Sequence, residues 1–248
     1  METGVAVVAL APGLAVGSFL NVVAARVPKR RSLVSPGSAC PSCAAPIAWR
    51  DNLPIVSYVL LRGRCRSCGA AISWKYPAVE AATALLVSAC FLRFGLTGTA
   101  AVGAFFCCVL VAVTVTDLEQ RIIPNRIVLP ATAVVLLAQT ALGPSPEWPV
   151  AAFGSAFFLL LVALAYPAGM GMGDVKLALL LGAALGRTVP VALMVGIVTA
   201  LVPAVAILAR HGRAGRKMGI PFGPFLALGG VIALFAGHQL LHAYLSLR

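Results

Sequence analysis

Two aspartates occur next to apolar segments, where a carboxylate is costly. The chain has 248 residues and only seven acidic ones. Asp117 follows a long apolar run, and Asp174 follows the glycine-rich segment Gly171-Met172-Gly173. Two carboxyl groups at close range cannot both be ionised, so they share a proton. The ionised partner can then take a proton from water while the protonated one polarises a carbonyl group, which is chemistry suited to hydrolysis.

The same residues allow a simpler interpretation. Both aspartates could be ordinary helix-end residues solvated at a membrane interface, and Asp174 could simply favour the positive N-terminal end of its helix.

The residues around Asp174 suit the hydrolytic interpretation. Gly171 and Gly173 permit unusual backbone angles and would let a substrate strand approach the main chain. Lys176, two residues after Asp174, is a candidate partner for an acidic substrate residue. The sequence alone leaves both interpretations open.

Four cysteines form two C-x-x-C knuckles. Cys40 and Cys43 make the first, and Cys65 and Cys68 make the second, with 21 residues between them. Two such knuckles can present four thiolates in the tetrahedron that Zn²⁺ prefers, and a closed site of four thiolates is structural. The alternative is four free thiols or a redox pair. Three further cysteines lie outside the knuckles in apolar segments, where we expect them to be small packing residues: Cys90, Cys107 and Cys108.

The composition indicates a membrane protein. Hydrophobic residues make up 60% of the chain and charged residues 10%, with a mean hydropathy of +0.99. Soluble domains carry about 25% charged residues. The net charge of +12 does not indicate nucleic-acid binding, because the basic residues lie between apolar runs rather than along one face.

Eight apolar segments can be distinguished, at about 4–27, 77–94, 99–117, 127–142, 149–168, 175–186, 188–209 and 221–245. The stretch 175–209 could be one kinked span, or a hairpin turning at Gly186-Arg187-Thr188. With eight spans, 16 of the 19 basic residues lie on the cytoplasmic side, and those left outside are Arg93, Arg187 and Arg248. A single span would place Arg187 in mid-membrane, which costs about 2.5–3.5 kcal/mol. The charges therefore favour eight spans with the N-terminus outside.

The predicted fold is all-α and polytopic, with about eight transmembrane helices and a small cytoplasmic zinc-ribbon-like insertion. Residues 1–27 form the first transmembrane helix, 28–76 the four-cysteine loop, and 77–248 the remaining membrane domain. Gly13-x-x-x-Gly17 suits close helix contact. Trp49 and Trp74 flank the knuckles and are expected either to pack as the small core of the loop or to lie on lipid headgroups.

With these motifs in order, the chain resembles the type IV prepilin peptidases, also called prepilin leader peptidases and N-methyltransferases. The matching segments are Gly17-Ser18-Phe19-Leu20-Asn21-Val22-Val23, Arg26-Val27-Pro28, Cys40-Pro41-Ser42-Cys43, Asp51-Asn52-Leu53-Pro54, Leu61-Arg62-Gly63-Arg64-Cys65, Ile72-Ser73-Trp74-Lys75-Tyr76-Pro77 with Glu80, Thr116-Asp117-Leu118 with Ile123-Pro124-Asn125, Gly171-Met172-Gly173-Asp174-Val175-Lys176, and Ile220-Pro221-Phe222-Gly223-Pro224. Together they cover most of the chain.

The resemblance implies that Asp117 and Asp174 are a catalytic pair in the bacterial inner membrane. Such enzymes remove the leader of prepilins and pseudopilins at the cytoplasmic face, cutting after a glycine just ahead of an apolar helix. Many then methylate the new N-terminus with S-adenosylmethionine, and the four-cysteine loop marks these bifunctional members. The expected partners are prepilin or pseudopilin and membrane lipid, without nucleic acid. The sequence does not specify an oligomeric state.

Two other classes of function fit parts of the sequence. In an ion- or proton-coupled transporter, Asp117 and Asp174 would carry cations or protons. Transport sites tend to lie near the bilayer midplane, whereas both aspartates are predicted at one face, which counts against this interpretation. A non-catalytic scaffold whose zinc loop recruits partners is the third alternative.

Overall fold

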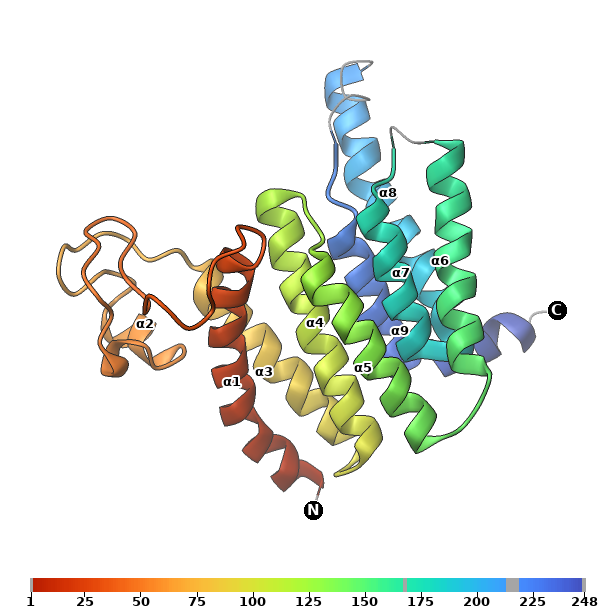
Figure 1. Ribbon diagram of the computed structural model, residues 1–248, viewed down its shortest axis with the longest axis horizontal. Helices are drawn as coiled ribbons and strands as arrows, with labels where there is room; N and C mark the ends of the chain where they lie inside the picture. The colour runs from red at the N-terminus through yellow and green to blue at the C-terminus, as the bar shows by residue number, and fades with distance from the viewer. Residues whose placement is uncertain (1, 167–168, 213–218, 247–248) are drawn as a thin grey trace. The chain divides into compact units, whose positions relative to one another are not determined.

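The computed structural model describes residues 2–166, 169–212 and 219–246, and within these ranges the chain is helical, with no strand. Figure 1 shows the order of the elements. The α-helices are α1 (Glu2–Arg26), α2 (Val56–Leu60), α3 (Lys75–Phe94), α4 (Gly98–Gln120), α5 (Asn125–Leu142), α6 (Glu147–Ala165), α7 (Met172–Leu185), α8 (Val189–His211) and α9 (Gly223–Ser246). Two short 3-10 helices are η1 (Trp49–Asp51) and η2 (Gly186–Thr188).

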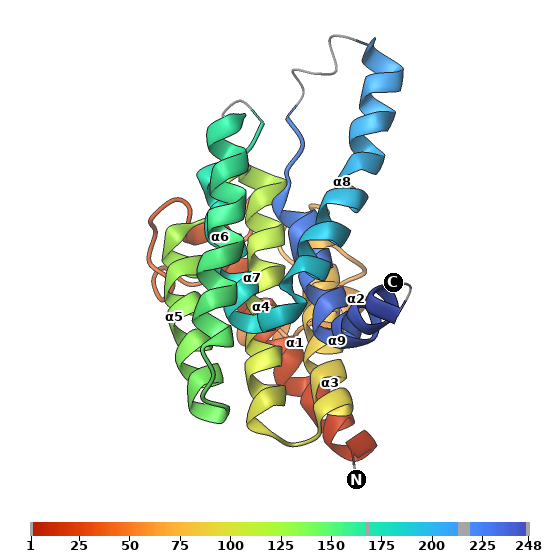
Figure 2. The same ribbon diagram turned by 90° about the vertical axis from the view of Figure 1, so that its right-hand side faces the viewer.

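The helices that could cross a membrane agree with the apolar segments predicted from the sequence. Seven helical stretches in the described residues are long and apolar enough to cross a membrane, and one of them, Met172–His211, is 40 residues long. This stretch is broken at η2 into α7 and α8, which run in opposite directions (Figures 1 and 2). The predicted turn at residues 186–188 is therefore confirmed, and the eight predicted segments correspond to α1 and α3–α9.

The chain divides into two compact units, residues 1–112 and 113–248, with the boundary inside α4. In the first unit, α1 packs on α3 through the two glycines of the small-residue motif. A Cβ on Gly13 would lie 2.7 Å from the Cα of Ala84, and a Cβ on Gly17 would lie 2.7 Å from the Cα of Glu80. The backbones thus approach more closely than any larger residue would allow, which confirms the predicted role of the motif.

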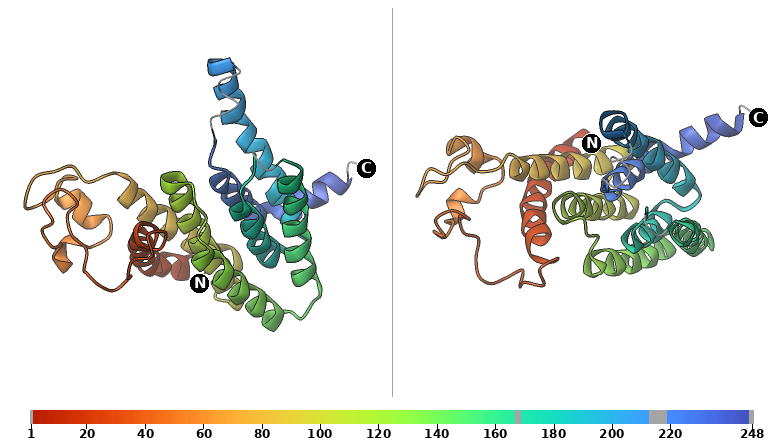
Figure 3. Two further views of the ribbon diagram at one scale, coloured as in Figure 1. Left: turned by 45° about the horizontal axis from the view of Figure 1, so that its top comes forward. Right: turned by 90° about the horizontal axis from the view of Figure 1, so that it is seen from above.

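The four-cysteine loop extends from the ends of α1 and α3 (Figure 3). Its attachment to α3 includes the buried Glu80, whose Oε2 accepts a 2.8 Å hydrogen bond from the Ile55 N–H. Inside the loop, Arg66 binds both carboxylate oxygens of Asp51, at 2.8 and 2.6 Å. Trp49 and Trp74 are 81% and 74% exposed, so the alternative in which they form a small core is wrong.

In the second unit, α7 is enclosed by its neighbours. Its contact with α6 is antiparallel and repeats every four residues: Ser155 Oγ donates a 2.7 Å hydrogen bond to the Ala178 carbonyl. One turn earlier on α6, the Ala151 carbonyl lies against Gly182. One turn earlier again, Glu147 accepts a 2.8 Å hydrogen bond from the Arg187 N–H. If the same pairing continues for one more turn in the opposite direction, Asp174 of α7 lies at the same level along the helix axis as Leu159 of α6.

Part of the predicted charge distribution lies outside the described residues. This applies to Arg213, Arg216, Lys217 and Arg248, four of the basic residues used to orient the chain.

We expect Gly17→Val to push α1 away from α3, because the added side chain has backbone rather than open space beside it. Overpacking of this kind costs about 1–3 kcal/mol. Thermal unfolding in lipid nanodiscs should show a lower midpoint than wild type. The matched control is Gly4→Val on the same helix, where a Cβ would meet nothing within 4 Å. An unchanged midpoint for Gly17→Val would contradict the packing described.

Candidate active site and metal centre

Asp117 lies near the C-terminal end of α4, which continues one turn beyond the predicted limit, to Gln120. The side chain is buried, and its Oδ2 accepts a 2.9 Å hydrogen bond from the Gly223 N–H. Gly223 is the first residue of α9, and the first N–H groups of a helix have no partner within it. The positive end of α9 therefore supplies the donor that a buried carboxylate requires.

Asp174 lies in the first turn of α7 and is also buried. Its Oδ2 accepts a 3.2 Å hydrogen bond from the Gly171 N–H, and its own N–H donates to the Gly171 carbonyl at 3.1 Å. A carboxylate that accepts from the residue preceding the helix is half of a capping box. Asp174 thus does cap its helix, as the simpler interpretation supposed, but capping does not exclude a second role.

The two carboxyl groups line one cavity of about 270 Å³. The segments that carry them also meet the same side chain, because a Cβ on Gly173 and a Cβ on Gly223 would both lie against Ile123, at 3.0 and 3.3 Å. The predicted convergence of the two aspartates is therefore what the structure contains. The lining residues are Asp117, Arg121, Ile122, Ile123, Asn125, Gly169, Gly171, Gly173, Asp174, Ile220 and Phe222.

The glycines of the site are required for space rather than for unusual backbone angles. Gly171 has φ −84° and ψ 151°, which any residue can adopt, so the expectation of special angles is wrong there. A Cβ on Gly173 would lie 3.0 Å from the Cβ of Ile123, and a Cβ on Gly223 would lie 2.7 Å from Oδ2 of Asp117. Small residues at these positions let Ile123 and Asp117 occupy the wall of the cavity.

Lys176 contributes to the site indirectly. Its Nζ donates a 2.9 Å hydrogen bond to Oδ1 of Asn125, and Asn125 lines the cavity, whereas Lys176 is not among the described lining residues. Among the described residues, Arg121 is the basic residue that lines the cavity, one turn after Asp117. Sequence reasoning missed Arg121 and the Gly223 N–H, although the four-residue spacing from Asp117 was a usable signal for Arg121.

Along the axis of α6, the level of the site falls between the two ends of the helix. Leu159, which is level with Asp174, precedes Ala165 by six residues, or about 9 Å at a helical rise of about 1.5 Å per residue. In the other direction it follows Glu147 by twelve residues, or about 18 Å. The two carboxyl groups are therefore placed between the two ends of α6 along the helix axis, and both side chains are buried.

A second cluster lies in the four-cysteine loop. The sulfur atoms of Cys40, Cys43, Cys65 and Cys68 all lie within 4.8 Å of one another. Four thiolates around Zn²⁺ at about 2.3 Å would be about 3.8 Å apart in a regular tetrahedron, and the Sγ atoms of Cys40 and Cys68 are 3.9 Å apart. The donor set and its spacing therefore suit a metal ion.

The two knuckles share one backbone design. The Ala44 N–H donates to the Cys40 carbonyl at 2.9 Å, and the Gly69 N–H donates to the Cys65 carbonyl at 2.9 Å. Both donors have positive φ, of 57° and 70°. In the first knuckle, hydrogen bonds from the backbone N–H groups of Cys43 and Ser42 lower the pKa of the Cys40 thiol to about 6. A lowered pKa favours the thiolate, which is the form of cysteine that binds a metal.

Comparison with known proteins agrees with this architecture. Residues 12–94 match the model of the bacterial peptidase A24 N-terminal domain, and residues 104–205 match that of the type IV leader peptidase family. The two matches cover most of the chain, so the protein belongs to the type IV leader peptidase family. No solved structure gives a significant match.

Several curated relatives carry the same description, prepilin leader peptidase/N-methyltransferase. The relative from Bacillus subtilis is 33% identical over 240 residues, covering 95% of this chain and 96% of that protein. The relative from Pseudomonas aeruginosa is 36% identical over 267 residues, covering 94% and 91%. The relative from Aeromonas salmonicida is 36% identical over 269 residues, covering 94% and 91%.

We expect Gly223→Ala to displace the Asp117 carboxyl group, because the added methyl group would lie only 2.7 Å from its Oδ2. A displacement of about 1 Å can cost about 100-fold in rate. Peptidase activity should fall by roughly that factor, in kcat more than in KM, while the protein remains folded. Gly219→Ala is the control, since its Cβ would meet only the far end of the Arg121 side chain, at 3.5 Å. Full activity of Gly223→Ala would contradict the assigned contact.

We expect Cys65→Ser to abolish metal binding, because a hydroxyl group is a poor replacement for a thiolate ligand. Elemental analysis of the purified protein should find about one metal ion per chain in wild type and a large loss in the variant. Cys108→Ser, which changes a cysteine of α4 outside the cluster, should retain the metal. Equal metal content in all three proteins would show that the cluster is not the binding site.

Proposed function

We propose that the protein is an intramembrane aspartic endopeptidase that removes the leader peptide of type IV prepilins or pseudopilins and then methylates the new N-terminus. The observation that carries the proposal is the meeting of Asp117 and Asp174 in one cavity of a multi-pass membrane protein. The family of the chain and the shared description of its relatives support the same activity.

In the proposed mechanism, the two carboxyl groups hold a single proton. The ionised group takes a proton from a water molecule in the cavity, and the protonated group donates a hydrogen bond to the scissile carbonyl oxygen. The water oxygen then attacks the carbonyl carbon, and the tetrahedral species loses its amine after receiving a proton from the dyad. The Gly223 and Gly171 N–H groups hold the reacting carboxyl groups in place throughout.

The positions of the other groups suggest supporting roles. Asn125, held by Lys176, and Arg121 line the cavity and would bind polar or acidic parts of the substrate next to the scissile bond. Gly171 and Gly173 keep the floor of the cavity free of side chains. We assign catalysis to Asp117 and Asp174, and substrate contact to the segment around them.

The four-cysteine cluster is proposed to hold a structural Zn²⁺. Four thiolates complete its coordination, so the ion would stabilise the loop without taking part in catalysis. S-adenosylmethionine is the proposed methyl donor, in agreement with the N-methyltransferase description of the relatives.

We place the protein in the bacterial inner membrane, with the N-terminal end of α1 outside and the cysteine loop and aspartates on the cytoplasmic side. This orientation follows the distribution of basic residues, since nine of them lie between Arg26 and Lys75. The division into a first helix (1–27), a loop domain (28–76) and a peptidase domain (77–248) is proposed on the same basis.

We expect Asp117→Asn and Asp174→Asn each to lower prepilin cleavage by roughly 10³-fold or more, because an amide cannot exchange the proton that the mechanism moves. Cleavage is measured by mass spectrometry of prepilin incubated with purified enzyme and S-adenosylmethionine. Glu119→Gln is the matched control, as it removes an exposed carboxylate from the same end of α4.

The same assay separates the two proposed activities. Wild type should release a leader-free product that also gains the mass of one methyl group. Cleavage by either aspartate variant at the rate of Glu119→Gln would contradict the dyad. Cleavage without the added mass would contradict the methyltransferase part alone.

A further inference from the structure

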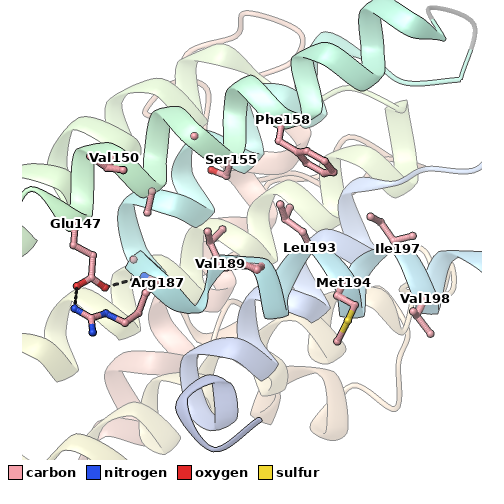
Figure 4. A pocket seen from close by; sticks show the side chains of 14 residues that line it. Glu147, Val150, Ser155, Phe158, Arg187, Val189, Leu193, Met194, Ile197 and Val198 are labelled. Carbon is pink, nitrogen blue, oxygen red and sulfur yellow. Dashed lines mark hydrogen bonds and ion pairs between the residues drawn. The ribbon is translucent and has the colours of Figure 1, made fainter. Parts of the chain in front are cut away.

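A long apolar groove lies between α6 and α8. Its volume is about 650 Å³, and apart from one ion pair its walls are almost entirely apolar. The ion pair closes one end, where Arg187 Nη2 lies 2.8 Å from Oε2 of Glu147. Figure 4 shows Phe158 of α6 facing Leu193 and Ile197 of α8 toward the other end.

One end of the groove lies at the Glu147–Arg187 ion pair. On α6, the opposite end lies at the same level along the helix axis as the carboxyl groups of the site. The four-residue repeat of the α6–α7 contact places Leu159 level with Asp174. Phe158, the last groove residue on α6, is the immediate neighbour of Leu159. The groove therefore extends from the Glu147–Arg187 pair to the depth of Asp174.

The α8 side gives the same result independently. The contact between α8 and α9 is also antiparallel: the Ala192 carbonyl lies against Gly229, and a Cβ on Gly196 would lie 3.2 Å from the Cα of Leu226. Continuing this series places Gly223, whose N–H holds Asp117, level with residues 198–199. Val198 is the last groove residue on α8. Both walls of the groove thus end at the depth of the dyad.

We propose that this groove binds the apolar helix that follows the scissile bond of the substrate. The inference rests on the proposed function, in which the cut falls just ahead of such a helix. A polypeptide whose scissile bond lies at the carboxyl groups must continue away from them through the membrane, and the groove offers about 16 Å of apolar wall in that direction, from Glu147 to Phe158.

The walls suit a helix in particular. Gly154 lies in the middle of the α6 wall, and a Cβ added there would meet nothing within 4 Å. Ala151 and Pro190 are further small or compact lining residues. Helices associate in membranes by close packing against small residues, since lipid gives no hydrophobic drive. A lipid acyl chain could fill the same volume, but nothing would require its end to coincide with the catalytic level.

The test is to fill the groove at Gly154. Gly154→Leu places a large side chain in the open space without touching Asp117 or Asp174. We expect KM for a full-length prepilin to rise roughly tenfold or more with kcat changed by less than about twofold, as when ground-state binding is lost. Gly4→Leu is the matched control, because it is the same substitution at an equally open glycine in α1.

A second substrate identifies the part that the groove binds. A short peptide that contains the leader and the scissile bond but lacks the apolar helix has nothing to place in the groove. Gly154→Leu should therefore lower kcat/KM for full-length prepilin relative to that for the short peptide by roughly tenfold. An equal effect on both substrates, or none on either, would overturn the proposal.

Photo-crosslinking locates the substrate directly, and it does not depend on Gly154→Leu folding. In an Asp174→Asn background, Phe158 is replaced by benzoylphenylalanine, which should crosslink to the apolar helix of bound prepilin. Phe157 is the control position, because it is exposed on α6 but is not among the described lining residues. Crosslinks from position 158 to lipid alone, or equal crosslinking to prepilin from both positions, would contradict the proposal.

The two proposals fail in different ways. If wild-type enzyme leaves prepilin uncut, the proposed function is wrong. If wild type cuts prepilin and Gly154→Leu does so with the same KM, the peptidase assignment stands and the groove assignment is wrong.

Discussion

The structure depends on providing hydrogen-bond donors to two carboxyl groups inside an apolar bundle. An unpaired buried carboxylate would cost several kcal/mol, and here each one receives a backbone N–H at the beginning of a helix. For this arrangement, α7 and α9 must both begin at the level of the site. α7 is accordingly 14 residues long, or about 21 Å, which is less than the roughly 30 Å hydrocarbon thickness. The turn at Gly186 and the reversal into α8 follow from that short length.

The ends of α6 and α7 are staggered. α6 continues about four residues, or about 6 Å, beyond the level at which α7 begins. The cavity at the aspartates is lined by the end of α4, the start of α5, the start of α7 and the segments that precede α7 and α9. The α6–α8 groove approaches the same level from the other end.

The sequence was most informative where a residue type is unusual for its surroundings in the chain. Aspartates beside apolar runs and paired cysteines in a reduced loop predicted both clusters, and helix limits were predicted to within about three residues because apolar runs end at charges and prolines. The partners of these residues were not predictable. The bonds from Gly223 to Asp117 and from Lys176 to Asn125 depend on how distant helices are aligned, which local patterns do not record. Trp49 and Trp74 were open to two interpretations because both were consistent with a small loop domain, and their exposure excludes the core.

The central claim is that Asp117 and Asp174 face each other closely enough to act together, and this can be measured without substrate. A variant with cysteine at both positions, in a background where the three other membrane cysteines are replaced by alanine, can be treated in lipid nanodiscs with a short thiol-bridging reagent. Mass spectrometry of the digest should find residues 117 and 174 joined in one crosslinked peptide in high yield. Complete labelling of each cysteine by the reagent without any bridge between them would contradict the shared site.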